Sequence, residues 1–132
     1  MSITNYKGDI GEAAFVLAAA KKGYWVGKMP QDCPYDFVLD TGLGPKRVQI
    51  KFRSLTKTGT IQLKLENNTF TNRRSYTEEN IDAFVVYIPD VEELFYIPIS
   101  KIGNLTEVTF RYHPPKNGMT AGIRFISEFK DW

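Results

Sequence analysis

Three polar side chains fall within two neighbouring apolar runs of the sequence. Asp36 stands near the start of run 35–39, and Gln49 and Lys51 interrupt run 48–52. Both runs are rich in β-branched and aromatic residues, as strands are. Because side chains alternate between the two faces of a strand, Gln49 and Lys51 share one face, and Asp36 joins them if the strands pair. Two oxygen donors beside an ammonium group suit the metal-assisted hydrolysis of a phosphodiester.

A fourth candidate group lies on a predicted helix over residues 4–22. Glu12 is followed by Phe15, Val16 and Ala19, at helical spacings that place all four residues on one face. A carboxylate beside an apolar stripe is costly to bury unless it is paired or bound to a cation. We therefore expect Glu12 to join the site; the alternative is a boundary glutamate that points into solvent.

The remaining pattern predicts an α/β or α+β domain in which the N-terminal helix packs on a mixed central sheet. The continuous apolar run 81–88 is typical of a strand that is covered on both faces. Residues 67–80 are polar and predict a loop, and 100–102 predict a helical turn. The other strands are predicted at 24–27, 35–40, 46–53, 60–66, 93–97, 107–112 and 121–126.

Bulk composition excludes several classes of protein. The 132 residues, 42% of them apolar, predict one globular domain over 1–132. No run reaches the about 18 apolar residues of a membrane span, so no membrane partner is expected. The single cysteine, Cys33, excludes an internal disulfide and a multi-cysteine zinc site. We expect a cytoplasmic protein.

Positive charge is concentrated in the middle of the chain. Residues 46–74 carry eight basic side chains against the single acidic Glu66, whereas the whole chain has a net charge of only +2. Such a segment is suited to contact phosphates, although a solvated hairpin with scattered cations is an equal alternative. The candidates for DNA binding are Lys57, Lys64, Arg73, Arg74, Arg47 and Arg53.

Three short motifs follow one another in an order that resembles the PD-(D/E)XK nuclease superfamily. They are Gly8-Asp9-Ile10-Gly11-Glu12, Pro34-Tyr35-Asp36 and Gln49-Ile50-Lys51. With Tyr76 and the runs 81–87 and 95–98, their order is most similar to the bacterial, cyanobacterial-type group I intron homing endonucleases of this superfamily. The resemblance covers roughly residues 4–100. It implies a restriction-endonuclease-like core and a homing-type nuclease that cuts double-stranded DNA at specific sites.

The resemblance also implies a role for each site residue. Mg²⁺ (or Mn²⁺) would be bound by Asp36, the Gln49 carbonyl, the Ile50 backbone oxygen and Glu12, with Lys51 beside the phosphate. Hydrolysis would leave a 5′-phosphate and a 3′-hydroxyl. Gln49 stands where the superfamily usually has an acid, and its amide oxygen ligates a cation without adding charge.

Three alternatives stay open at this point. A Holliday-junction resolvase or repair-type nuclease has the same fold, and a catalytically inactive DNA-binding domain would explain Gln49. One site per chain predicts a homo-oligomer, a dimer at least and a tetramer by resemblance, if two strands are cut. The aromatic residues of the late segment either pack between subunits or belong to the core: Phe110, Tyr112, Phe125, Phe129 and Trp132.

Overall fold

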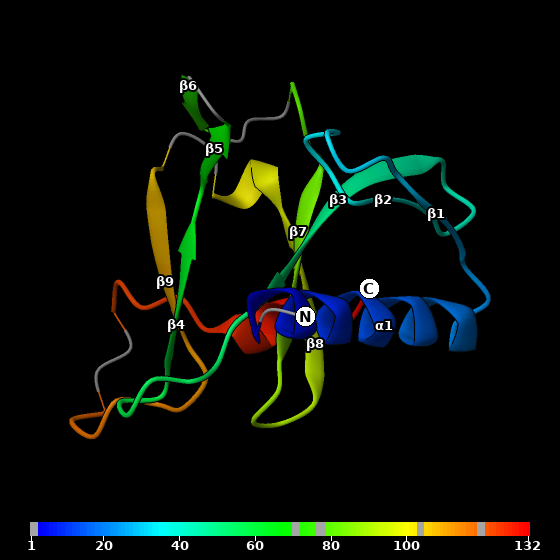
Figure 1. Cartoon of the computed structure of the whole chain (residues 1–132). Coiled ribbons are helices and arrows are strands. Elements are labelled where there is room, and N and C mark those ends of the chain that lie inside the picture. Colours follow the sequence, from blue (N-terminus) through cyan, green and yellow to red (C-terminus); the bar gives the residue numbers. More distant parts are fainter. Residues whose placement is uncertain (1–2, 70–71, 76–78, 103–104, 119–120) are drawn as a thin grey trace.

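The computed structural model describes residues 3–69, 72–75, 79–102, 105–118 and 121–132. One helix, α1, lies against a five-stranded sheet in the order β1-β2-β3-β7-β8, in which only β3 and β7 are parallel (Figure 1). The mixed sheet with an N-terminal helix on it was predicted and is confirmed. The elements are α1 (Ile3–Lys21), β1 (Trp25–Lys28), β2 (Phe37–Asp40), β3 (Pro45–Phe52), β4 (Thr60–Lys64), β5 (Glu66–Thr69), β6 (Asn72–Ser75), β7 (Ala83–Ile88), β8 (Glu93–Pro98), η1 (Ile99–Lys101), β9 (Glu107–Arg111) and η2 (Ile126–Phe129).

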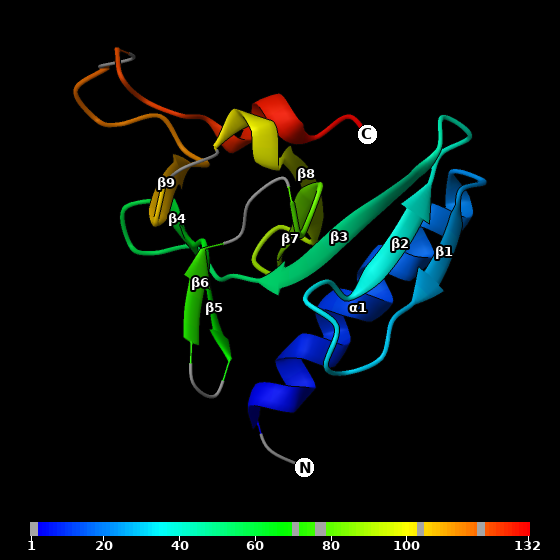
Figure 2. The same cartoon turned by 90° about the horizontal axis from the view of Figure 1, so that it is seen from above.

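α1 covers one face of the sheet, across β3, β7 and β1 (Figure 2). Phe15 and Ala19 are fully buried in the cluster that also holds Val48 and Ile50 of β3. Gly11 faces the same strand, and a Cβ there would make an ordinary van der Waals contact with the Ile50 side chain at 3.5 Å. The buried stripe is therefore narrower than the sequence predicted, because Val16 turns outward and is 37% exposed.

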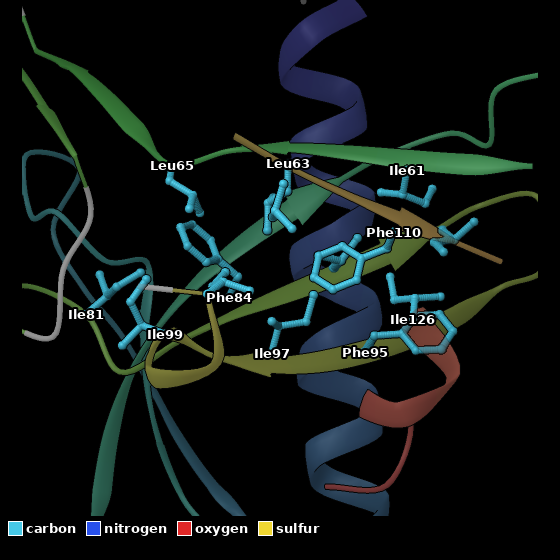
Figure 3. Packing of buried hydrophobic residues seen from close by; sticks show 14 residues of the cluster. Ile61, Leu63, Leu65, Ile81, Phe84, Phe95, Ile97, Ile99, Phe110 and Ile126 are labelled. Carbon is cyan, nitrogen blue, oxygen red and sulfur yellow. The ribbon is translucent and has the colours of Figure 1, made fainter. Parts of the chain in front are cut away.

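A second layer covers the opposite face at the β7–β8 end of the sheet. β4 and β9 pair antiparallel, and their apolar side chains enclose a core with those of β7 and β8 (Figure 3). Leu63, Phe84 and Phe110 meet there from three different strands, each at most 1% exposed. Only one of the six β7 residues, Tyr87, is not buried, which confirms a strand that is covered on both faces.

Two sequence-based expectations are wrong. Within 67–80, β5 and β6 form an antiparallel hairpin instead of a loop, because cross-strand pairing orders a polar segment that has no apolar periodicity. Residues 121–126 form no strand; Phe125 makes a single bridge to Arg111, and η2 follows. A hydrophobic pattern reports burial, and here Ile126 is buried from a 3-10 turn.

The late aromatic residues resolve largely as core. Phe110 is buried between the layers, and Tyr112 and Phe129 pack against the same cluster. Trp132 stacks on Phe15, with ring centroids 5.8 Å apart, and closes the α1 side of the sheet. None of the helices in the described part of the chain is both long and apolar enough to cross a membrane.

Leu63→Ala tests the packing between the layers. Leu63 is fully buried, so the substitution leaves a cavity, and we expect the free energy of unfolding to fall by about 2–5 kcal/mol in urea denaturation. Gln62→Ala is the matched control on the exposed face of the same strand and should change stability by less than about 0.5 kcal/mol. Equal losses in the two variants would contradict the core assignment.

Candidate active site

Asp36 lies just before β2, between β1 and β3. Its N–H donates to the Val48 carbonyl at 2.9 Å, and its own carbonyl accepts the Met29 N–H at 2.9 Å. The regular β2–β3 pairing ends at Phe37 and Val48. Beyond that point the Ile50 N–H donates to Asp36 Oδ2 at 2.9 Å, so the carboxylate is fixed against the backbone of the next strand. The sequence element around Asp36 and the one around Lys51 therefore meet.

The Asp36 carboxylate is held in conditions that disfavour its charge. Burial is the largest effect and raises the pKa of Asp36, and the nearby Glu12 carboxylate raises it as well. The hydrogen bond from the Ile50 N–H and the positive charges of Lys51 and Lys28 lower it. The net shift of the pKa is upward. A half-buried carboxylate beside a second carboxylate is an arrangement that a bound cation would relieve.

Lys51 and Arg53 add two positive charges to the site at the end of β3. Burial lowers the pKa of Lys51, and Arg53 lowers it further, while Asp36 acts in the opposite direction. Arg53 is itself partly buried, and its guanidinium donates to the Phe52 carbonyl at 2.9 Å. Two cations therefore lie close together at the end of β3, and one of them, Lys51, is near the Asp36 carboxylate.

Gln49 and Glu12 come from opposite sides of the sheet. Val48 and Ile50 face α1, so Gln49 and Lys51 occupy the other face of β3 by alternation. The half-buried Gln49 amide has no hydrogen-bond partner among the described residues. Glu12 belongs to α1, and Lys28 of β1 holds it in an ion pair of 3.4 Å. The structure brings Asp36, Ile50 and Lys51 together directly and adds Glu12 electrostatically.

Only two of the four possible ligands for a cation at this site are charged. In the part of the chain that the structure describes, no group of three His, Cys, Asp or Glu side chains is placed to hold a metal ion. The oxygen donors are instead two carboxylates, one amide carbonyl and one backbone carbonyl, from Glu12, Asp36, Gln49 and Ile50. Hard oxygen donors of this kind fit Mg²⁺.

Comparison with known proteins identifies the family. A family model described as PD-(D/E)XK endonuclease matches residues 2–132. The chain belongs to the PD-(D/E)XK endonuclease family. It is therefore a nuclease of a family that acts on DNA and generally uses divalent metal ions.

Two solved structures have a similar fold. The bacterial homing endonuclease I-Ssp6803I matches with a TM-score of 0.74 and 24% identity, over 91% of this chain and 86% of its own. The Holliday junction resolvase Hjc from Archaeoglobus fulgidus matches with a TM-score of 0.53 and 11% identity, over 80% of this chain and 84% of its own. At these identities the likeness shows the fold. A comparison with curated proteins finds no match.

The structure separates the predicted DNA-binding residues of this PD-(D/E)XK chain into four groups, the last of which is Arg47 alone. Lys57 and Lys64 are exposed, and Lys64 shares the outer face of β4 with Gln62. Arg73 and Arg74 belong to β6, opposite Asn68 and Asn67, and their side chains lie outside the described residues, as does Tyr76. Arg53 lies beside Lys51 at the site.

Arg47 is engaged in the fold. Its Nε donates to Asp82 Oδ2 at 3.1 Å and its Nη1 to the Glu79 carbonyl at 2.7 Å, while its own N–H donates to Asp82 Oδ2 at 2.7 Å. The hydrogen bond from Arg47 lowers the pKa of Asp82. This pair links the residue before β7 to β3. Arg47 therefore serves the fold, and the proposed DNA interface does not depend on it.

Sequence reasoning missed Lys28. Lys28 ends β1, and its ammonium group pairs with Glu12 and lowers the pKa of Asp36. A lysine at the end of a short, mostly exposed edge strand carries no sequence signal of this role. Only the folding of α1 beside β1 brings Lys28 to the carboxylates.

Asp36→Asn tests the electrostatic cost of the site in the PD-(D/E)XK fold. Because the folded-state pKa of Asp36 is raised, its stabilising contribution is present below the ordinary pKa and is lost as the pH rises through the raised value. At neutral pH the neutral amide should therefore raise the melting temperature of the metal-free protein by a few degrees. This gain in melting temperature should disappear at acidic pH, and thermal unfolding measured over a series of pH values would detect the change.

Asp32→Asn is the matched control, since Asp32 is an exposed loop aspartate. It should leave the melting temperature unchanged across the same pH range. A lower melting temperature for Asp36→Asn at neutral pH would show that the charged carboxylate stabilises the fold.

Proposed function

We propose that this chain is a site-specific, metal-dependent endonuclease of the homing type that cuts double-stranded DNA to 5′-phosphate and 3′-hydroxyl ends. One observation carries the proposal: the Asp36 carboxylate is fixed by the Ile50 N–H at 2.9 Å, next to the partly buried Lys51. This contact joins both halves of the family motif at the end of β3. The similar fold of a homing endonuclease supports the choice of substrate.

Asp36, the Gln49 carbonyl and the Ile50 backbone oxygen would hold Mg²⁺ or Mn²⁺, and Glu12, which comes from the α1 side of the sheet, would join through a second cation or a coordinated water. When bound, the ion polarises the scissile phosphate and lowers the pKa of a coordinated water. Asp36 needs no rearrangement for this role, since its hydrogen bond to Ile50 already fixes the carboxylate.

Lys51 would donate a hydrogen bond to a phosphate oxygen and stabilise the charge that develops there. Arg53, beside it, adds a second positive charge on the same side of the site. Glu12 would bind a second cation or a water of the first, and Lys28 keeps its carboxylate in place until then.

The DNA duplex would be bound by the exposed basic groups around β4 and the β5–β6 hairpin. A two-stranded antiparallel ribbon fits the major groove of B-form DNA. The β5–β6 hairpin is such a ribbon, carries Arg73 and Arg74, and projects from the end of β4 (Figure 2). Lys64 and Lys57 lie along the same polypeptide segment. Several phosphate contacts would make binding weaken steeply with added salt.

One site per chain cuts one strand, so we propose a homo-oligomer as the active form, a dimer at least and a tetramer by analogy with the homing type. A junction resolvase of the same fold is the second candidate, favoured by the match to Hjc. Cleavage of branched but not of linear duplex DNA would identify that activity.

Lys51→Ala should abolish cleavage and spare binding. We expect plasmid cutting in Mg²⁺ to fall by about 10²–10³-fold, because the lost ammonium group acts on the charge that forms during the reaction. DNA affinity, measured by fluorescence anisotropy, should change by less than about threefold. Lys101→Ala removes an exposed lysine from η1 and is the control.

EDTA should stop cleavage of DNA by the wild type, because it removes the divalent cation. Cutting a randomised duplex library and sequencing the cut ends would give the target sequence. No cutting of any DNA by the wild type in Mg²⁺ or Mn²⁺ would identify an inactive DNA-binding domain. Full cutting by Lys51→Ala would remove that residue from the mechanism.

Gln49→Glu should strengthen cation binding. The carboxylate adds a negative charge beside Asp36, so we expect the dissociation constant for Mg²⁺ to fall by about tenfold in calorimetric titrations. Gln62→Glu places the same charge on the outer face of β4 and should leave Mg²⁺ binding unchanged. Identical affinities for wild type and Gln49→Glu would show that residue 49 is not a ligand.

A further inference from the structure

A basic cleft lies at the end of the β4–β9 layer away from the β5–β6 hairpin. It has a volume of about 560 Å³ and opens between the β3–β4 turn and the segment that follows β9. The two segments lie side by side at the lower left of Figure 1, below β4 and β9. Its cationic lining comes from Lys57, Arg111 and Lys116. None of the candidate catalytic residues lines it.

The charges around this cleft are uncompensated. In the described ranges, no aspartate or glutamate lines it, and neither Lys57 nor Lys116 forms an ion pair. Both lysines are exposed. Bringing three cations to one concave surface costs electrostatic energy in the free protein, and an anion bound between them would remove that cost.

Hydrogen bonds already fix the walls of the cleft. Arg111 Nη2 donates to the Thr58 carbonyl at 2.8 Å, and its Nε donates to the His113 carbonyl at 3.0 Å. One guanidinium thus ties the β3–β4 turn to the segment after β9. Its Nη1 has no partner among the described residues and is left to donate.

Gly59 sets the close approach of the two walls. The His113 ring lies directly over Gly59, where an added Cβ would come within 2.9 Å of it. Gly59 also has a positive φ of 76°, which other residues rarely adopt. The Tyr112 N–H donates to the Gly59 carbonyl at 2.9 Å, so backbone as well as side-chain hydrogen bonds hold the walls together.

We propose that this cleft binds a backbone phosphate of duplex DNA, at a position away from the bond that is cut. Guanidinium and ammonium groups on a preformed concave surface are suited to phosphate oxygens, and contacts of this kind position a duplex without reading its sequence. The choice of DNA as the anion rests on the proposed function; the anion site itself does not. It would give the enzyme a second anchor beyond the β5–β6 hairpin.

His113 provides a direct probe, because it is the only histidine of the chain. In tag-free protein with EDTA, its ring resonances should shift on titration with an arbitrary duplex of about 30 base pairs. Inorganic phosphate should produce the same shift only at far higher concentration. Unchanged ring resonances at saturating DNA, or a response to phosphate at concentrations where the duplex gives none, would overturn the proposal.

Charge removal tests the same cleft quantitatively. The double substitution Lys57→Ala and Lys116→Ala should lower duplex affinity by about tenfold or more at moderate salt and reduce the salt slope by about two. The control, Lys7→Ala with Lys21→Ala, removes two exposed lysines from α1 and should leave the slope unchanged. Equal effects of the two pairs would show generic charge attraction and overturn the site.

These binding measurements need no catalysis, so they separate the two proposals. A shift of His113 in a protein that cuts no DNA would support the cleft and refute the nuclease function. Mg²⁺-dependent cutting with an unresponsive His113 would do the reverse.

Discussion

The parallel pairing of β3 with β7 is the constraint on which the site depends. β7 is buried between α1 and the β4–β9 layer, and its register with β3 sets Gln49 beside Phe84 and Ile50 beside Val85. Because side chains alternate along a strand, a shift of the β3–β7 register by one residue would turn Gln49 and Lys51 towards α1 and move Ile50 out of the core. The packing of the hydrophobic core thereby determines which face of β3 carries Gln49 and Lys51.

The groups proposed to act in catalysis near the end of β3 lie in positions that lower the stability of their charged forms. Asp36 is kept half-buried near a second carboxylate, and Lys51 is kept near a second cation, so both side chains are held where their charged forms are disfavoured. The opposite case is the Arg47–Asp82 pair, in which each charge stabilises the other. Perturbed groups that lack such mutual compensation are typical of functional sites, whereas compensated pairs serve the fold.

The second layer links the chemistry to the surfaces that would hold DNA. Its inner face supplies Ile61, Leu63 and Phe110 to the core, so β4 is rigidly attached to the central sheet. Its two ends carry the β5–β6 hairpin and the basic cleft, on opposite sides of the layer (Figure 1). If both ends contact DNA as proposed, this strand would set the spacing between the two contacts.

The sequence by itself determined the elements whose periodicity reflects burial: the helix, the strands around Asp36, Lys51 and Phe84, and through the motif order, the family. It failed where order comes from pairing alone, as in the polar β5–β6 hairpin, and at 121–126, where an apolar pattern belongs to a turn. Tertiary structure decided the rest. The Asp36–Ile50 hydrogen bond, the Lys28–Glu12 pair and the contact of His113 with Gly59 join residues distant in sequence, and local propensity contains no information on such encounters.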